Sequence, residues 1–213
     1  MIYEVPPPSD PIQQGDIFKG IPRIDINLAS LSLLEEGEQL ETTWQDILAD
    51  EALPQRVTAV LPVKPVLAIV ITQNCDAVRS SVLSLCEIGD YLMEGEKATP
   101  PKTPKGWQSK IVKGMIEQPK FFYLPAEPSV GIADRKAVDF RSVLRILRTD
   151  LEGMRDHRLG RLMQVANEHF RETLAQFFIR YPVNAWYPLT KEEFQAYAES
   201  QKGETIQPYP WQE

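Results

Sequence analysis

The sequence predicts an α+β fold, in which a strongly bent antiparallel sheet or a small SH3-like barrel carries a carboxy-terminal helical pair packed on it. Three observations lead to this fold class. Strand-like segments dominate residues 15–140, one of them (66–71) is apolar on both faces, and the last third of the chain has apolar residues at helical spacing. A chain of 213 residues can bury one sizeable core, so we expect a single domain.

The amino-terminal segment, residues 1–14, carries four prolines. Each proline lacks the N–H that a helix or a sheet ladder requires, so we expect an extended arm. The segment has neither the basic start nor the apolar run of a secretory signal, and no part of the chain approaches the roughly 20 apolar residues of a membrane helix. We therefore expect a cytoplasmic protein with no membrane partner.

Residues 15–140 are expected to form a β-rich, barrel-like core. Thr43 can cap a short helix that Pro54 closes, and residues 66–71 predict the middle strand of the sheet because both of their faces are apolar. Residues 94–120 hold four prolines and six lysines, which predicts a long basic loop. The other strand candidates are residues 15–22, 23–34, 56–63, 80–88 and 120–126.

Residues 141–213 are expected to be helical. The run from Arg158 to Tyr181 places leucines and phenylalanines at helical spacing, which is typical of a face that packs on a core rather than of a cofactor site. We therefore expect no cofactor. Thr149 and Thr190, each followed three residues later by a glutamate, fit capping boxes at the starts of two helices.

The two cysteines, Cys75 and Cys86, are expected to be free thiols. In a hairpin of residues 66–75 and 81–88 they would stand about five positions out of register, roughly 17 Å along a strand, beyond the Cα separation of about 7 Å that a disulfide allows. Two cysteines and two histidines without close spacing match no zinc pattern, so we expect no metal.

The charge of the chain limits its partners. A net charge of -7 argues against general binding to DNA or RNA, because such binding depends on neutralising phosphates. Locally the sign reverses, since residues 141–161 hold six arginines and three acids. Two interpretations stay open: a basic patch that meets RNA or an acidic protein surface, or a solvated helix face with paired charges.

The apolar strand ends in a run of polar residues, Thr72, Gln73, Asn74, Cys75 and Asp76. One interpretation is a binding niche in which Gln73, Asn74 and Asp76 meet Asp16, because binding sites are often placed where strands end. The other is architectural: Cys75 is a buried small apolar residue, and Asn74 and Asp76 bond to the backbone of the turn. A cysteine nucleophile would need a nearby cation or histidine, and the sequence places no histidine near this one.

Three short segments resemble the small barrel toxins of the MazF and PemK type: GDIF at 15–18, KPVLAIVI at 64–71 and LCEI at 85–88. The resemblance implies a ribonuclease in which Lys64 and Asp16 lie near the scissile phosphate. Lys64 stands where that family has its catalytic arginine, and a lysine lacks the bidentate fork of arginine.

Four segments together resemble a family of uncharacterised bacterial proteins. These read GDI at 15–17, TQNCD at 72–76, VDF at 138–140 and FFIR at 177–180, in the order of the pattern GDI, (S/T)QxCD, VDF and FFxR. This resemblance spans most of the chain and implies no activity.

The resulting expectation is a non-catalytic binding or accessory protein of the bacterial cytosol with a protein partner, because no catalytic group of residues is evident. The alternative is a ribonuclease related to the MazF and PemK toxins. The candidate binding residues are Asp16, Lys64, Gln73, Asn74, Cys75 and Asp76.

Overall fold

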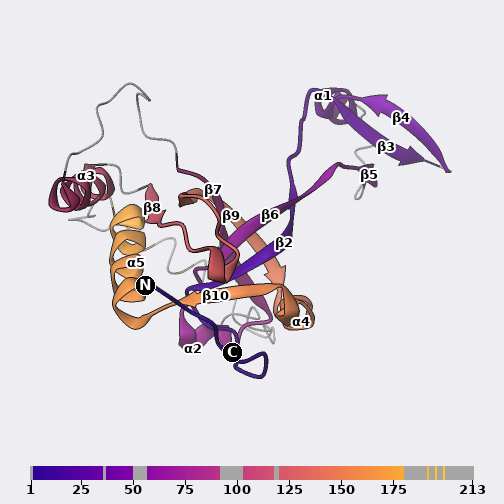
Figure 1. Ribbon diagram of the computed structural model, residues 1–213. Coiled ribbons are helices and arrows are strands. Elements are labelled where there is room, and N and C mark those ends of the chain that lie inside the picture. The colour runs from indigo at the N-terminus through magenta and orange to yellow at the C-terminus, as the bar shows by residue number, and fades with distance from the viewer. Residues whose placement is uncertain are drawn as a thin grey trace.

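A computed structural model describes residues 2–35, 37–49, 57–91, 103–117 and 120–179, together with the single residues 191, 195 and 199 (Figure 1). The main body is one antiparallel sheet with the strand order β1-β10-β2-β6-β7-β9-β8. In that order the strands are Tyr3–Glu4, Arg158–Leu162, Asp16–Ile24, Val63–Val70, Val82–Asp90, Lys136–Leu147 and Phe121–Leu124.

The sheet is open, with β1 and β8 at its two edges. The predicted α+β class and the large antiparallel sheet are therefore confirmed, whereas the alternative of a closed SH3-like barrel is not. The strand predicted to be central is β6, which is fourth of the seven. Its two faces are both apolar because each one faces a separate core.

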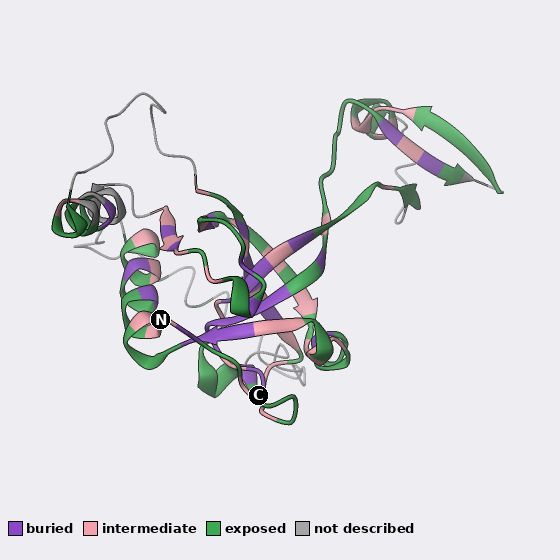
Figure 2. Cartoon of the chain, viewed as in Figure 1, coloured by how far each residue is buried: buried purple, intermediate pink, exposed green. Residues whose placement is uncertain are grey.

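Those two cores lie on opposite faces of the sheet. On one face, Ile69 belongs to a cluster with Phe140 and with Phe170 of helix α5 (Gln164–Phe178). On the other face, Val70 packs with Leu85 and with Leu151 of helix α4 (Arg148–Gly153). Figure 2 shows buried residues running along the middle strands and along one side of α5. This covering of both faces explains why the sequence of β6 does not alternate.

A small lobe extends from the main sheet, and we define it as the described part of residues 25–62 (Figure 1). Beyond Phe18, β2 keeps only β6 as a neighbour, so the two strands form a ribbon that leads to the lobe. The lobe is a sheet of order β4-β3-β5 with one helix. Its elements are β3 (Leu31–Glu35), β4 (Glu38–Thr42), α1 (Trp44–Ala49) and β5 (Ala59–Val60).

The cap predicted at Thr43 is confirmed. Its Oγ1 accepts a hydrogen bond from the backbone N–H of Asp46 at 3.2 Å, and the Asp46 carboxylate accepts from the backbone N–H of Thr43 at 3.3 Å. This reciprocal pair satisfies N–H groups that the first turn of α1 leaves free. The closing role expected of Pro54 lies outside the described residues.

The amino-terminal arm is extended and is docked on the body. Its β1 pairs with β10, and the buried Tyr3 donates its hydroxyl proton to the carbonyl of Pro125 at 2.8 Å. Ile12 is also buried, in the core beneath α4. Residues 2–14 are therefore part of the fold.

The prediction that residues 141–213 are helical is wrong in two places. Strand β9 continues to Leu147, and residues 158–162 form β10. Leu159 and Leu162 stand three positions apart, like Arg158 and Arg161, which imitates a helical period. The pairing of this segment with β1 and β2 decides its conformation instead.

The predicted helix ends and the predicted loop are also corrected. Leu147, not Thr149, is the N-cap residue of α4. Within the loop expected at 94–120, helix α3 covers Pro104–Glu117. Of the second carboxy-terminal helix, only residues 191, 195 and 199 are described, and they are helical. In the part of the chain that the structure describes, no helix has the length and apolar character needed to cross a membrane.

Candidate functional site

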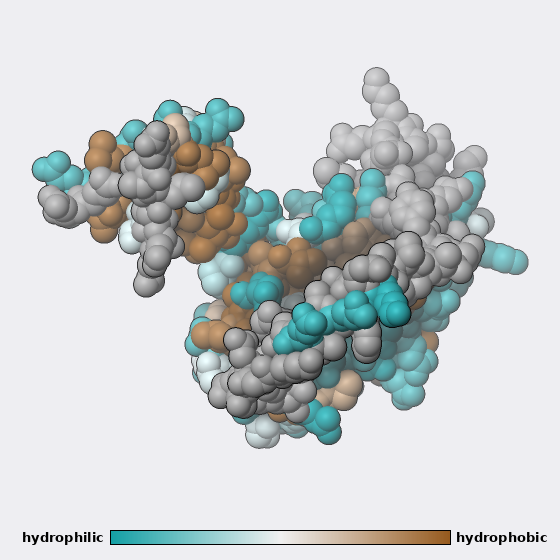
Figure 3. Space-filling view, turned by 180° about the vertical axis from the view of Figure 1, so that it is seen from behind, coloured by the Kyte–Doolittle hydropathy of each residue, from teal (hydrophilic) through white to brown (hydrophobic). Residues whose placement is uncertain are grey.

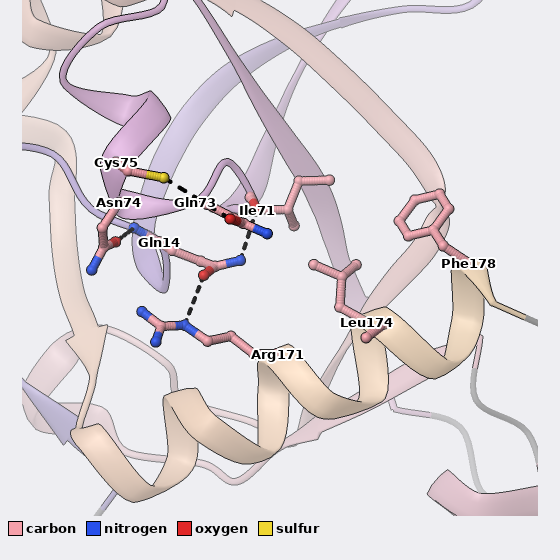
Figure 4. A pocket seen from close by; sticks show the side chains of 9 residues that line it. Gln14, Ile71, Gln73, Asn74, Cys75, Arg171, Leu174 and Phe178 are labelled. Carbon is pink, nitrogen blue, oxygen red and sulfur yellow. Dashed lines mark hydrogen bonds between the residues drawn. The ribbon is translucent and has the colours of Figure 1, made fainter.

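A pocket of about 600 Å³ lies where β6 ends, between the following turn and helix α5 (Figure 4). Its polar lining comes from Gln14, Gln73, Asn74, Cys75 and Arg171, and its apolar lining from Ile71, Leu174, Ala175 and Phe178. Three of the residues predicted from the strand end, Gln73, Asn74 and Cys75, are thus brought together. The pocket adds Gln14 and Arg171, which the sequence analysis missed.

The turn after β6 presents these polar groups because it closes into one short helix, α2 (Asn74–Ala77). The backbone N–H groups of Asp76 and Ala77 both donate to the carbonyl of Gln73, at 3.0 and 2.8 Å. This turn rotates Cys75 out to the surface, so the expectation of a buried Cys75 is wrong. Asp76 is exposed, and its carboxylate makes no hydrogen bond or ion pair with the described residues, so its expected bond to the turn is absent there.

Gln14 organises the pocket through four hydrogen bonds. Its backbone N–H donates to Asn74 Oδ1 at 2.8 Å, and its carbonyl accepts from Asn167 Nδ2 at 3.2 Å. Its side-chain Nε2 donates to the carbonyl of Ile71 at 2.8 Å, while Oε1 accepts from Arg171 Nε, also at 2.8 Å. With 2% of its surface exposed, Gln14 is a satisfied buried amide that ties the arm, the turn and α5 together.

Gly15 allows this close approach. Its φ of +91° lies in the left-handed region, and a Cβ at this position would stand 3.0 Å from Asn167 Oδ1. Any other residue would be strained at this φ and would crowd the Asn167 side chain, which bonds to the carbonyl of Gln14. The glycine of the GDI segment therefore has a structural role next to Gln14.

Arg171 supplies the positive charge of the pocket. In Figure 4 the guanidinium of Arg171 lies next to Gln14, and the hydrogen bond from Arg171 Nε to Gln14 Oε1 fixes its orientation. The two terminal nitrogens of Arg171 have no hydrogen-bond partner among the residues that the structure describes. A guanidinium held in this way keeps its outer N–H groups available for a carboxylate or a phosphate, which it can bind through two parallel bonds.

The apolar wall comes from the same face of α5. Leu174, Ala175 and Phe178 follow Arg171 at three, four and seven positions, which places all four on one side of the helix. The paired phenylalanines have different roles: Phe177 packs against Phe140, with ring centroids 5.7 Å apart, whereas Phe178 lines the pocket and is 62% exposed. A ligand can therefore contact an aromatic ring beside the cation.

Neither thiol is placed for nucleophilic catalysis. Cys75 Sγ lies 4.0 Å from Gln73 Oε1, and among the described residues no histidine lines this pocket. Cys86 is buried, and burial raises the pKa of its thiol to about 12. Both cysteines are free, as predicted. Within the described ranges, no cluster of three or more histidine, cysteine or acidic residues could hold a metal ion.

Asp16 and Lys64 do not line the pocket, and they lie far from each other. Asp16 is fully buried, where its carboxylate accepts from Arg161 Nε at 2.5 Å and from Arg158 Nη1 at 3.2 Å. Lys64 is exposed and pairs across the ribbon with Arg23, seven positions along β2 from Asp16, or about 20 Å away. The niche expected to join Asp16 and Asp76 is not formed, nor is the arrangement that the ribonuclease alternative requires.

The six arginines of residues 141–161 do not share one surface. Arg158 and Arg161 are turned inward onto Asp16, and Arg141 is paired with Asp139 through two bonds. By contrast, the four segments of the (S/T)QxCD pattern do converge. Ile17, Phe140 and Phe177 share one core cluster, next to the pocket that the TQNCD segment lines. Arg180 lies outside the described residues.

No known family model matches the chain, and no curated protein is significantly similar to it.

Proposed function

We propose that the chain is a non-catalytic binding protein whose pocket captures a ligand by an anionic group, a carboxylate or a phosphate. The contact between Gln14 Oε1 and Arg171 Nε carries this proposal, because it orients a guanidinium whose outer nitrogens are otherwise unused within the described residues. The apolar part of the ligand lies against Leu174 and Phe178. Pockets of several hundred Å³ with few polar groups in fixed positions are typical of ligand sites.

The chemistry of the lining supports binding over catalysis. Gln73 and Asn74 are neutral amides that can orient a ligand but cannot transfer protons at neutral pH. Cys75 is the one nucleophile among the described lining residues, and it lacks a base. An ionic hydrogen bond contributes about 1.5–3 kcal/mol, so Arg171 would dominate the affinity for an anion.

Small aromatic probes test the proposal. Phenylacetate and phenyl phosphate carry an anion beside a ring, and phenylacetamide is an uncharged analogue of the first. Thermal shift and calorimetric titration of the full chain should show that the two anions bind and that the amide binds at least tenfold more weakly. Equal binding of phenylacetate and phenylacetamide, or no binding of either anion, would contradict the proposal.

Variants then assign the binding to the pocket. Arg171→Gln should abolish binding of both anions, and Arg171→Lys should restore it only in part because lysine has no fork. Arg79→Gln, which removes an exposed arginine that does not line the pocket, is the matched control and should bind as the parent does. Anion binding that survives Arg171→Gln would place the site elsewhere.

A further inference from the structure

The small lobe and the pocket differ in how their exposed side chains are arranged. Figure 3 shows apolar atoms on a lobe that stands apart from the body. The strand register places Leu34 and Val60 on one face of the lobe sheet and Leu40 on the other, so these three side chains do not form one surface. The polar groups of the pocket, by contrast, line one cavity and are bonded to one residue, Gln14.

The amide groups at the pocket are fixed in orientation by partners that can play only one role. Asn74 Oδ1 faces the backbone N–H of Gln14, which can only donate. Gln14 Nε2 faces the carbonyl of Ile71, which can only accept, and Gln14 Oε1 faces Arg171 Nε, which can only donate. The network therefore determines which end of each amide is oxygen and which is nitrogen.

The groups left for a ligand are hydrogen-bond donors. Among the described lining residues, unpaired side-chain nitrogens belong to Gln73, Asn74 and Arg171. The side-chain oxygens of Gln14 and Asn74 each accept a bond within the protein. Gln73 Oε1 accepts from the thiol of Cys75 at 4.0 Å. The lining therefore favours a ligand group that only accepts hydrogen bonds, because each of its oxygens then meets a donor.

Asn74 and Arg171 are placed to act on one anion. Both are bonded to Gln14, by hydrogen bonds of 2.8 Å each. In Figure 4 the free amide nitrogen of Asn74 and the guanidinium of Arg171 lie on the same side of Gln14. A carboxylate has two oxygens, and the two terminal nitrogens of Arg171 already match them. An anion with a third terminal oxygen can also accept a bond from Asn74 Nδ2.

We propose that Asn74 makes the pocket selective for phosphate monoesters over carboxylates, because it donates to the third terminal oxygen of the phosphate. This inference rests on the proposed function, since it names the class of anion that Arg171 captures. A phosphate monoester has three terminal oxygens and a charge of about -1.5 to -2 at pH 7. Arg171 binds two of these oxygens and Asn74 the third, while Gln14 positions both side chains.

Calorimetric titration of the full chain with phenyl phosphate and phenylacetate tests the selectivity. Phenyl phosphate should bind the parent chain at least tenfold more tightly, since a hydrogen bond to a charged group strengthens binding by about that factor. In Asn74→Leu the affinity for phenyl phosphate should fall about tenfold, whereas that for phenylacetate should change less than about threefold. Gln176→Leu removes an exposed amide that does not line the pocket, and this matched control should keep the preference of the parent.

Asn74→Asp is a second variant that keeps an oxygen for the backbone N–H of Gln14. It replaces the donor by a negative charge, so it should weaken the binding of phenyl phosphate at least tenfold more than that of phenylacetate. Circular dichroism and thermal melts check that each variant is folded. Equal affinity of the parent chain for the two anions, or a phosphate preference that persists in both Asn74 variants, would overturn this inference but not the proposed function. A parent chain that binds neither anion would overturn both.

Discussion

Replacing Gln14 by methionine tests whether this buried amide builds the pocket. Methionine has nearly the same length and volume, so the packing of the arm is kept while both side-chain hydrogen bonds are removed. One lost bond is neutral, from Nε2 to the carbonyl of Ile71, and the other is ionic, to Arg171. With about 1 kcal/mol for the neutral bond and about 1.5–3 kcal/mol for the ionic one, the expected loss of unfolding free energy is about 3 kcal/mol.

The measurement is urea unfolding followed by circular dichroism, beside titration with phenylacetate. In a chain of 213 residues, a loss of about 3 kcal/mol corresponds to a fall in melting temperature of about 6–12 °C. Affinity for phenylacetate should fall about tenfold or more, because Arg171 loses the contact that orients it. Gln176→Met is the control, since Gln176 is exposed on α5 and its side chain, among the described residues, bonds only to Glu172 of its own helix, at 3.4 Å.

The two readouts separate two roles for Gln14. A stable variant with unchanged affinity would refute the argument, because it would show that neither hydrogen bond matters. A loss of stability with full affinity would show that Gln14 supports the fold but does not position Arg171.

Three further predictions concern buried groups. Asp16→Asn should lower the unfolding free energy by about 3–5 kcal/mol, because it leaves two buried arginines without their carboxylate. Asp76→Asn should change it by less than about 0.5 kcal/mol, and equal urea midpoints for the two variants would contradict this. In the native state a disulfide reagent should label Cys75 at once and Cys86 only after unfolding, which an Ellman assay checks. Folding raises the pKa of the Cys86 thiol to about 12, so the free energy of unfolding should fall as the pH rises above about 9, where this thiol ionises only in the unfolded chain; urea unfolding between about pH 8 and 10 measures this loss. Phe170→Ala should cost about 3–5 kcal/mol, since the ring is fully buried between two other phenylalanines, and a loss below about 1 kcal/mol in calorimetry would show that α5 is not held by this core.

Sequence patterns predicted those parts of the fold that local chemistry determines. The apolar run of β6 identified the central strand, and Thr43 marked the start of α1. Strand β10 was missed because its leucines repeat at an interval of three, as in a helix. The buried carboxylate that binds its arginines belongs to Asp16, about 145 positions earlier in the sequence. A pattern read along one segment contains no information about such a partner.

The candidate site shows the same division. Gln73, Asn74 and Cys75 were found because they are contiguous and follow an apolar strand. Gln14 and Arg171 were missed because they are 157 positions apart in the sequence, and neither carries a local signal. Cys75 was expected inside because a strand precedes it, but the short helix α2 turns its thiol outward. Contacts across the tertiary structure determine which residues complete the pocket.

The docking of the arm affects the order in which the protein folds during synthesis. The carbonyl groups of Pro7 and Pro11 accept hydrogen bonds from Arg158 and Arg161, and Gln14 accepts one from Arg171. During synthesis the arm is therefore made before any of these partners, which lie more than 140 positions later in the chain. Contacts of such wide sequence separation form late and slowly. The arm is therefore among the last segments to reach its native place, and a deletion within it would act directly on the pocket.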